Sequence, residues 1–271
     1  MNRKYIYPLV IIIVTVALYY ADDYLAEENV SPSQTSKTTR ANSQEFDDTF
    51  LPSSTTGAII KHNFFTLSYS EKHEQAEWVA YELSKKDLSK NEFERPNFIE
   101  DKKVKTKSAD WRNYKNSGYD RGHLCPAGDR RNSFEAYNET FLTSNISPQN
   151  HDFNAGIWNR LEQKVRFWAE KYDGVYVVTG GVLHGNMKTI GEENVSVPNE
   201  FYKIIVDASE ENYRAIAFVI PNEPTSESFY EFAVSIDEIE AKTGIDFFPK
   251  LPDSIENDME RTIDLKAWGR K

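Results

Sequence analysis

The chain has 271 residues, a formal net charge of −11 at pH 7 and one cysteine. One cysteine excludes an intrachain disulfide, and the scattered histidines exclude a Cys/His zinc cluster. The negative charge excludes a protein that binds nucleic acid through a generally basic surface.

The N-terminal segment, residues 1–21, predicts export. Arg3 and Lys4 precede an almost wholly apolar run from Tyr5 to Ala21, and two aspartates follow it. At about 1.5 Å per residue this run is about 25 Å long as a helix, between a signal-peptide core and a full span. We expect an uncleaved membrane anchor with the rest on the extracytoplasmic side; the alternative is a cleaved signal and a secreted or periplasmic protein. A mitochondrial transit peptide, which is amphipathic and Arg-rich, is not expected.

Two further divisions follow from composition. Residues 22–58 are rich in Ser, Thr and other small polar residues. Such a segment cannot bury enough apolar area to offset chain entropy, which predicts a flexible linker. Residues 59–271 have a globular composition and are long enough for one sizeable core, so they are predicted to form a single domain.

The elements of this domain predict an α+β fold with a central, mainly antiparallel sheet. Residues 64–69, 75–83, 176–179, 201–206 and 213–220 are rich in β-branched and aromatic residues, which favours strands. Residues 154–170 read as one long helix, in which Asn154, Trp158 and Glu162 share a face at i, i+4 and i+8. Short elements are expected at 229–234 and 236–243, the second ending at Gly244.

The stretch from Tyr119 to Ala127 carries the most informative chemistry. His123 has an intrinsic pKa near 6.5, so it can be neutral near pH 7 and accept a proton from water. Arg121 can pair with phosphate oxygens through its fork of donors. Gly122 between them allows a turn or the close approach of a ligand. A base beside a phosphate clamp is what the hydrolysis of a phosphodiester requires.

A second stretch supplies oxygen ligands. Asn154 offers a neutral oxygen suited to Mg²⁺, which binds few protein groups and keeps several waters. Glu162 could hold one of those waters. Each residue also has a plainer interpretation: a surface turn with Asp120 and Arg121 paired, a turn at Asn145, a helix cap at Asn154, or a solvated Glu162. That all four plainer interpretations hold at once, in this order and spacing, is less expected than a single catalytic site.

The motifs resemble a known family. Asp120-Arg-Gly-His123, Ser144-Asn-Ile-Ser-Pro-Gln149 and the segment with Asn154, Trp158 and Glu162 are similar to the signature of the DNA/RNA non-specific endonucleases, the ββα-metal nucleases that include the endonuclease G type. The resemblance extends from about Ile59 to Trp268, and it implies the ββα-metal fold.

The resemblance also implies roles for individual residues. His123 would be the general base, Asn154 the direct Mg²⁺ ligand (with Mn²⁺ as a substitute), and Glu162 would position metal-bound water. Arg121 and Arg95 would contact the phosphate and stabilise the transition state. Asn145 would support the histidine or the scissile phosphate. The products would carry 5′-phosphates and 3′-hydroxyls.

Charge is unevenly distributed along the chain. Residues 101–131 contain nine Lys or Arg and four Asp, a balance of +5, whereas 207–240 and 246–264 are strongly acidic. A basic track beside the site with an acidic far side would orient a polyanion. The alternative is that Lys102 to Lys107 form a solvated loop.

These observations lead to one hypothesis and two rivals. The hypothesis is a Mg²⁺-dependent endonuclease that cuts DNA and RNA with little sequence preference, since backbone contacts carry no sequence information. The rivals are a non-cleaving, membrane-tethered nucleic-acid-binding module and one part of a toxin-like surface assembly. A homodimer is compatible with the family; the biological role cannot be deduced.

Overall fold

The computed structural model of the protein describes residues 48–208 and 213–270. The chain divides into two units, Met1–Asn42 and Ser43–Lys271, and the described residues all belong to the second. The expected anchor or signal segment at 1–21 and the linker up to residue 47 therefore lie outside the described residues.

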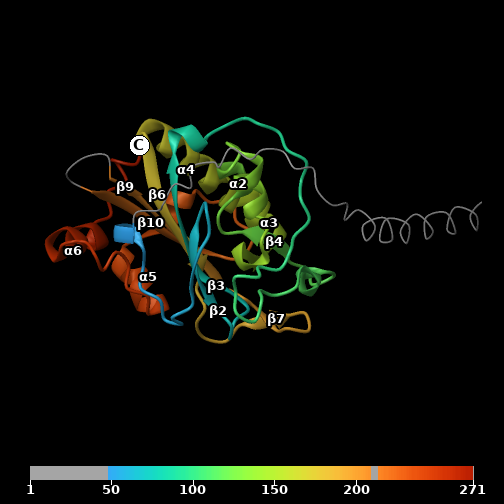
Figure 1. The fold of residues 1–271 in the computed structure, drawn as a ribbon. Helices are drawn as coiled ribbons and strands as arrows, with labels where there is room; N and C mark the ends of the chain where they lie inside the picture. Colours follow the sequence, from blue (N-terminus) through green and yellow to red (C-terminus); the bar gives the residue numbers. More distant parts are fainter. Residues whose placement is uncertain (1–47, 209–212, 271) are drawn as a thin grey trace, which may run out of the picture. The chain divides into compact units, whose positions relative to one another are not determined.

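A seven-stranded sheet forms the centre of this unit, and all of its neighbouring strands are antiparallel (Figure 1). Its strands, in spatial order, are β1 (Ile59–Lys61), β2 (Thr66–Ser70), β3 (Gln75–Ser84), β6 (Gly174–Gly181), β9 (Glu200–Asp207), β10 (Arg214–Pro221) and β11 (Ala233–Val234). Two separate ribbons are formed by β4 (Asp120–His123) with β5 (Ile146–Gln149), and by β7 (Lys188–Ile190) with β8 (Val195–Val197).

The sheet is buried on both faces, and successive residues of each strand point to opposite faces. On β3, Tyr81 belongs to one apolar cluster, whereas Trp78 and Ala80 belong to another. On β9, Ile205 and Ile204 divide in the same way. Consecutive residues of a strand therefore enter two different cores, which explains the nearly continuous apolar runs in the sequence.

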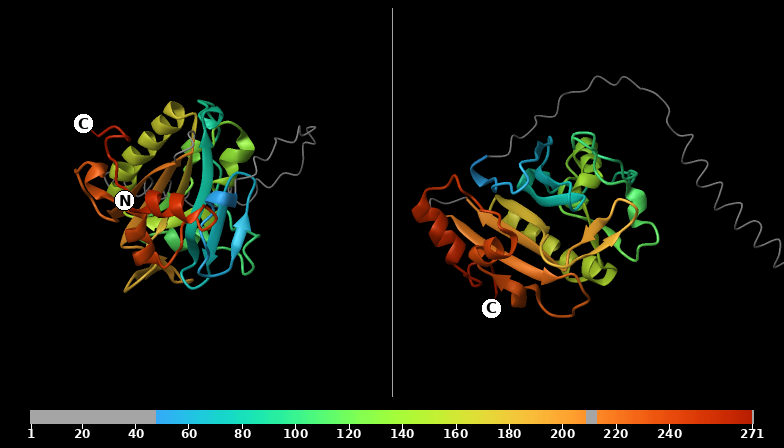
Figure 2. Two further views of the ribbon diagram at one scale, coloured as in Figure 1. Left: turned by 90° about the vertical axis from the view of Figure 1, so that its left-hand side faces the viewer. Right: turned by 90° about the horizontal axis from the view of Figure 1, so that it is seen from below.

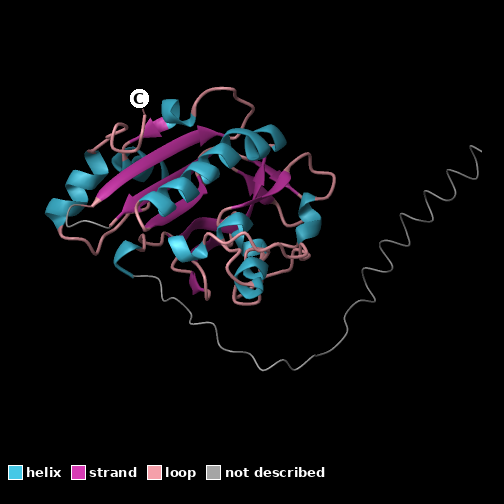
Figure 3. Cartoon of the chain, turned by 90° about the horizontal axis from the view of Figure 1, so that it is seen from above, coloured by secondary structure: helices cyan, strands magenta, loops and turns pink. Residues whose placement is uncertain are grey.

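Helices cover each face (Figures 2 and 3). Leu161, Val165 and Trp168 of α4 (Asn159–Lys171) pack into the first cluster. Ile239 of α5 (Ile236–Thr243) and Met259 of α6 (Asp253–Arg261) pack into the second. The remaining helices are α2 (Phe134–Glu139), α3 (His151–Phe153) and the short 3₁₀ turns at Asp48–Phe50, Lys85–Asp87, Trp111–Tyr114, Ala127–Asp129, Thr143–Asn145 and Phe229–Phe232.

The predicted α+β fold with a central antiparallel sheet is confirmed. The five predicted strands correspond to β2, β3, β6, β9 and β10. The predicted element at 236–243 is α5, and Gly244 follows it with φ of +70°, a left-handed C-cap. Packing starts earlier than residue 59, because Phe50 and Leu51 are already buried in the second cluster.

The helix predicted at 154–170 differs from the observed one. It begins as α3, passes through a π turn at Asn154–Trp158 and continues as α4. Gly156 in the π turn has φ −96° and ψ −107°, which is not helical. The prediction of a single regular helix is therefore wrong. The helix face that was expected to carry Asn154, Trp158 and Glu162 does not continue across the kink. The helix α6 was not predicted, because its acidic sequence contains few apolar residues.

Candidate active site

The three motifs come together in one β–β–α unit. The strands β4 and β5 pair antiparallel, with Arg121 opposite Pro148 and His123 opposite Ile146. The chain then enters α3, the π turn and α4 directly (Figure 1). This order brings residues of β4 beside the first helical turn that carries Asn154.

Gly122 is needed for packing rather than for a turn. It lies within β4, so the interpretation of this motif as a turn is wrong. A Cβ atom at Gly122 would lie 2.1 Å from Oε1 and 2.2 Å from Cδ of Gln149. The side chain of Gln149 thus covers the glycine, and neither its Oε1 nor its Nε2 has a hydrogen-bond partner among the described residues.

His123 is held as a neutral imidazole between aromatic rings. Its ring centroid lies 5.5 Å from that of Phe98 and 5.0 Å from that of Phe141. Burial, followed by the charges of Arg95 and Arg121, lowers the pKa of His123 to about 3. Its Nε2 atom is buried and has no hydrogen-bond partner among the described residues. A neutral ring nitrogen without a partner can accept a proton.

Two exposed guanidinium groups lie beside this histidine. The Cζ atom of Arg121 is 4.7 Å from the centroid of Phe98, and that of Arg95 is 5.6 Å from the same ring. No described residue forms an ion pair with either arginine, and burial and the charge of Arg95 lower the pKa of Arg121. Two like charges that share one ring, with no described carboxylate paired to either, can bind an anion.

This row of charges and rings extends beyond the predicted residues. The Cζ atom of Arg121 also lies 5.7 Å from the centroid of the Trp111 ring, and the Cζ atom of Arg112 lies 5.2 Å from the same centroid. Arginine alternates here with aromatic rings, an arrangement that suits a nucleic-acid backbone and its bases. The sequence analysis missed Trp111; its position between basic residues was the available signal.

Asn154 is oriented by a residue that the sequence analysis did not assign. Its Nδ2 donates to Oδ2 of Asp120 at 2.9 Å, and the Nδ1 atom of His151 lies 3.0 Å from the same oxygen. Asp120 therefore fixes the amide, and no described residue hydrogen bonds to Asn154 Oδ1. Asp120 does not pair with Arg121, which excludes the interpretation of the motif as a turn closed by that pair.

Glu162 interacts electrostatically with a group of charged side chains that includes Lys203 and Asp129. Burial raises the pKa of Glu162 to about 7, and the charge of Lys203 opposes that shift. Lys203 comes from β9, is 1% exposed, and its Nζ lies 4.6 Å from the Trp158 ring centroid without a hydrogen-bond partner among the described residues. Asp129 completes the group by accepting from Arg166 at 2.7 Å. Lys203 was missed, although a lysine inside an apolar strand was a visible signal.

The donor set fits a hydrated Mg²⁺ ion. Asn154 Oδ1 is a neutral oxygen, Glu162 makes no hydrogen bond or ion pair with the described residues, and both are only half-buried. Among the described residues, Trp158 Nε1, His123 Nε2 and both amide atoms of Gln149 are buried without a hydrogen-bond partner. Buried polar atoms are normally satisfied, so these unpaired ones are available to water or a ligand.

Asn145 is fully buried and does not reach the anion site. Its Oδ1 accepts from the backbone N of Cys125 at 2.8 Å, and its Nδ2 donates to the carbonyls of Cys125 and Thr140, both at 2.9 Å. All of its amide atoms are thus used to hold the backbone that follows His123. Of the two roles that the resemblance implies, these contacts fit support of the histidine.

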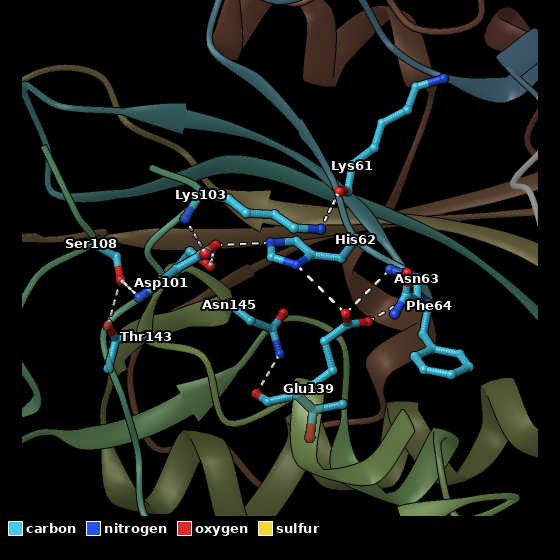
Figure 4. A network of polar contacts seen from close by, with 12 residues as sticks. Lys61, His62, Asn63, Phe64, Asp101, Lys103, Ser108, Glu139, Thr143 and Asn145 are labelled. Carbon is cyan, nitrogen blue, oxygen red and sulfur yellow. Dashed lines mark hydrogen bonds and ion pairs between the residues drawn. The ribbon is translucent and has the colours of Figure 1, made fainter. Parts of the chain in front are cut away.

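A buried histidine, His62, belongs to a network of polar contacts next to Asn145 (Figure 4). The Nε2 atom of His62 lies 2.8 Å from Oδ2 of Asp101, and its Nδ1 lies 3.6 Å from Oε1 of Glu139. Asp101 also accepts a hydrogen bond of 2.7 Å from Ser144, the neighbour of Asn145. The network therefore connects the end of β1 with the loop and helix that flank the site.

The comparisons with known proteins agree with this geometry. The sequence profile of the DNA/RNA non-specific endonuclease family matches residues 42–254. The mitochondrial nuclease EXOG of Danio rerio is 38% identical over 202 residues, which are 68% of this chain and 59% of the relative. A mitochondrial nuclease of Saccharomyces cerevisiae is 33% identical and covers 70% of this chain and 65% of its own. The chain thus spans less than two thirds of the length of these relatives.

These relatives also correct one prediction. Export, with the domain anchored or released on the extracytoplasmic side, is contradicted because the relatives just described are mitochondrial nucleases. Within residues 48–208 and 213–270, no helix has both the length and the apolar character needed to cross a membrane.

A solved structure supports the fold. The crystal structure of an EndoG/EndoGI complex, which addresses the inhibition of EndoG, aligns with a TM-score of 0.68 and 30% identity. The alignment covers 73% of this chain and 88% of that one. With the family profile, the curated relatives and this structure in agreement, the chain belongs to the DNA/RNA non-specific endonuclease family.

Proposed function

We propose that this protein is a Mg²⁺-dependent endonuclease that hydrolyses phosphodiester bonds of DNA and RNA with little sequence preference. The observation that carries the proposal is a neutral His123 Nε2 beside two guanidinium groups, Arg95 and Arg121, none of which has a hydrogen-bonding or ionic partner within the part of the chain that the structure describes. A base and an anion clamp in contact with the same aromatic ring are the parts that phosphodiester hydrolysis requires.

Each residue has a defined task in this reaction. Arg95 and Arg121 bind the non-bridging oxygens and neutralise the phosphate. His123 Nε2 takes a proton from the attacking water, whose oxygen forms the new bond to phosphorus as the bond to the 3′-oxygen breaks. The anionic phosphate offsets the two arginine charges that lower the pKa of His123, so substrate binding itself makes the base stronger.

Asn154 and Glu162 would hold the metal, Asn154 through Oδ1 and Glu162 through a water. The chemistry that Mg²⁺ supplies when bound is neutralisation of charge at the phosphate and at the departing oxygen; Mn²⁺ has similar ligand preferences. Asp120 keeps the Asn154 amide turned toward that position by accepting from its Nδ2.

The surface around the site explains why sequence would matter little. Arg112 and Trp111 extend the row formed by Arg121 and Arg95. Guanidinium groups recognise phosphates, and every base has a face that can stack on Trp111, so neither contact distinguishes one base from another. The sugar is not needed for either contact, which is consistent with both DNA and RNA as substrates.

A cleavage assay tests the proposal. Supercoiled plasmid and a structured RNA are incubated with the full chain in Mg²⁺ or EDTA, beside His123→Ala and the exposed control His184→Ala. We expect nicking and then degradation of both substrates only with metal, a loss of at least about 100-fold in His123→Ala, and full activity in the control. Binding without cleavage by the wild-type chain would refute the enzyme and favour a nucleic-acid-binding module.

A further inference from the structure

A group of acidic side chains lies on the opposite face of the sheet from α4. Asp237 and Glu240 are on α5, and Glu260 is on α6. One carboxylate oxygen from each lies within 4.8 Å of the others. The two helices pack against each other and on the second apolar cluster, whereas α4 packs on the first (Figure 1). The group is therefore separated from His123 and Asn154 by the central sheet.

No positively charged side chain of residues 48–208 and 213–270 pairs with this group. Among the described residues, no Lys, Arg or His forms an ion pair with any of the three carboxylates. The other charges that act on Glu260 come from Glu256 and Asp246, and both are also negative. Like charges at this separation repel, and the repulsion is relieved when Glu260 takes up a proton or when a cation binds between the carboxylates.

Glu260 provides a second, independent observation. The residue is 7% exposed, and its Oε1 atom is buried without a hydrogen-bond partner among the described residues. Burial, then the neighbouring acids, raises the pKa of Glu260 to about 8. This carboxylate, of which one oxygen lies close to two other carboxylates, thus lacks at Oε1 the partner among the described residues that buried polar groups normally have.

We propose that Asp237, Glu240 and Glu260 form a binding site for a divalent cation, with Ca²⁺ as the ion that fits best. Ca²⁺ binds carboxylate oxygens at about 2.3–2.6 Å, so ligands on opposite sides of the ion are about 4.8 Å apart. The three oxygens already lie within that separation. Mg²⁺ would require a smaller and more regular shell. The exposed side of Asp237 leaves room for the waters that complete the coordination.

The site would hold the C-terminal part of the domain together. Glu240 accepts a hydrogen bond of 2.8 Å from the backbone N of Phe247 through Oε1. An ion bound by Glu240 and Glu260 therefore connects α5, α6 and the loop that follows α5. Its role is structural, and it does not depend on the proposed nuclease activity.

Calorimetric titration with CaCl₂ tests the proposal in the full chain carrying Asn154→Ala, which removes the ligand of the active site. We expect one Ca²⁺ per chain with Kd of about 1 mM or tighter, and a melting temperature that rises with Ca²⁺. Glu260→Gln in this background should weaken binding at least tenfold. Glu238→Gln, which removes an exposed acid of α5 outside the group, should leave binding unchanged.

The melting temperatures give a signature that a merely structural carboxylate would not produce. In EDTA, Glu260→Gln should melt no lower than its parent, because one member of a repelling group is gone. In Ca²⁺ the parent should melt higher and Glu260→Gln should not respond. If Glu260→Gln does not fold, Asp237→Asn at the exposed position replaces it. No saturable binding, or equal losses in Glu260→Gln and Glu238→Gln, would overturn the proposal.

Discussion

The buried His62 predicts how the stability of the domain depends on pH. Its side chain and that of Asp101 are each 2% exposed, and hydrogen bonds and charges from Asp101 and Glu139 outweigh burial, so the pKa of His62 is raised. The folded protein therefore holds a proton that the unfolded chain releases near pH 6.5. The resulting stabilisation is fully present below about pH 6.5, and it is lost as the pH rises through the folded-state pKa.

The pH dependence of the free energy of unfolding is limited by the single proton that His62 binds. Uptake of one proton on folding changes the free energy of unfolding by at most about 1.4 kcal/mol per pH unit. In His62→Gln we expect a loss of about 2–3 kcal/mol at pH 6, the worth of a buried hydrogen bond to a charged group. The loss stays below the cost of an isolated buried charge, because Asp101 keeps its bonds from Ser144 and from the backbone N of Lys103.

The assay is urea unfolding in EDTA at constant ionic strength from pH 5 to pH 9, on wild type, His62→Gln and the exposed control His184→Gln. The pH range stays above the region in which Asp101, whose pKa His62 and its other partners lower, would itself titrate. The difference between wild type and His62→Gln should shrink above about pH 6.5. A difference that is constant, or that grows with pH, would show that His62 is neutral in the fold.

Three other predictions concern the site. Gly122→Ala should destabilise the domain by about 1–3 kcal/mol and reduce activity, because its Cβ would lie 2.1 Å from Gln149 Oε1; the combination with Gln149→Ala, measured by thermal melting, should recover most of the loss. Trp111→Ala should raise KM for single-stranded DNA about tenfold with kcat kept, whereas Trp111→Phe should be nearly neutral; an unchanged KM in the alanine variant would exclude stacking. Asn154→Ala should require at least about tenfold more Mg²⁺ for half-maximal cleavage of plasmid, and an unchanged Mg²⁺ dependence would mean that another group holds the metal.

The sequence was sufficient where the signal is local. The β-branched and aromatic content of residues 201–206 and 213–220 predicted β9 and β10, and the motif around His123 predicted the region of the site. It was insufficient where contacts join distant segments. Nothing in the sequence near Glu162 indicates that the charge of Lys203, from β9, acts on it. Nor does the sequence around Gly122 indicate that the side chain of Gln149 covers this glycine.

The contact of Asp120 shows a second reason why the sequence did not predict the whole site. A pair between Asp120 and Arg121, its neighbour in sequence, was the plainer interpretation of the motif, but in a strand neighbouring side chains point to opposite faces. Asp120 consequently contacts Asn154 and His151, which follow the paired strand β5. If the motif had been predicted as a strand rather than a turn, the alternation of side chains would have excluded the pair of Asp120 with Arg121.

The π turn at Asn154–Trp158 limits how the length of this segment can vary. A π turn contains one residue more than the α-helical turn that it replaces. Deleting a single residue here would allow a regular helix, but everything after it would rotate by about 100° about the helix axis. Leu161 and Val165 would then leave the core, and Glu162 would change its position relative to Asn154. We therefore infer that insertions and deletions are tolerated in the surface loops of this domain but not between Asn154 and Glu162.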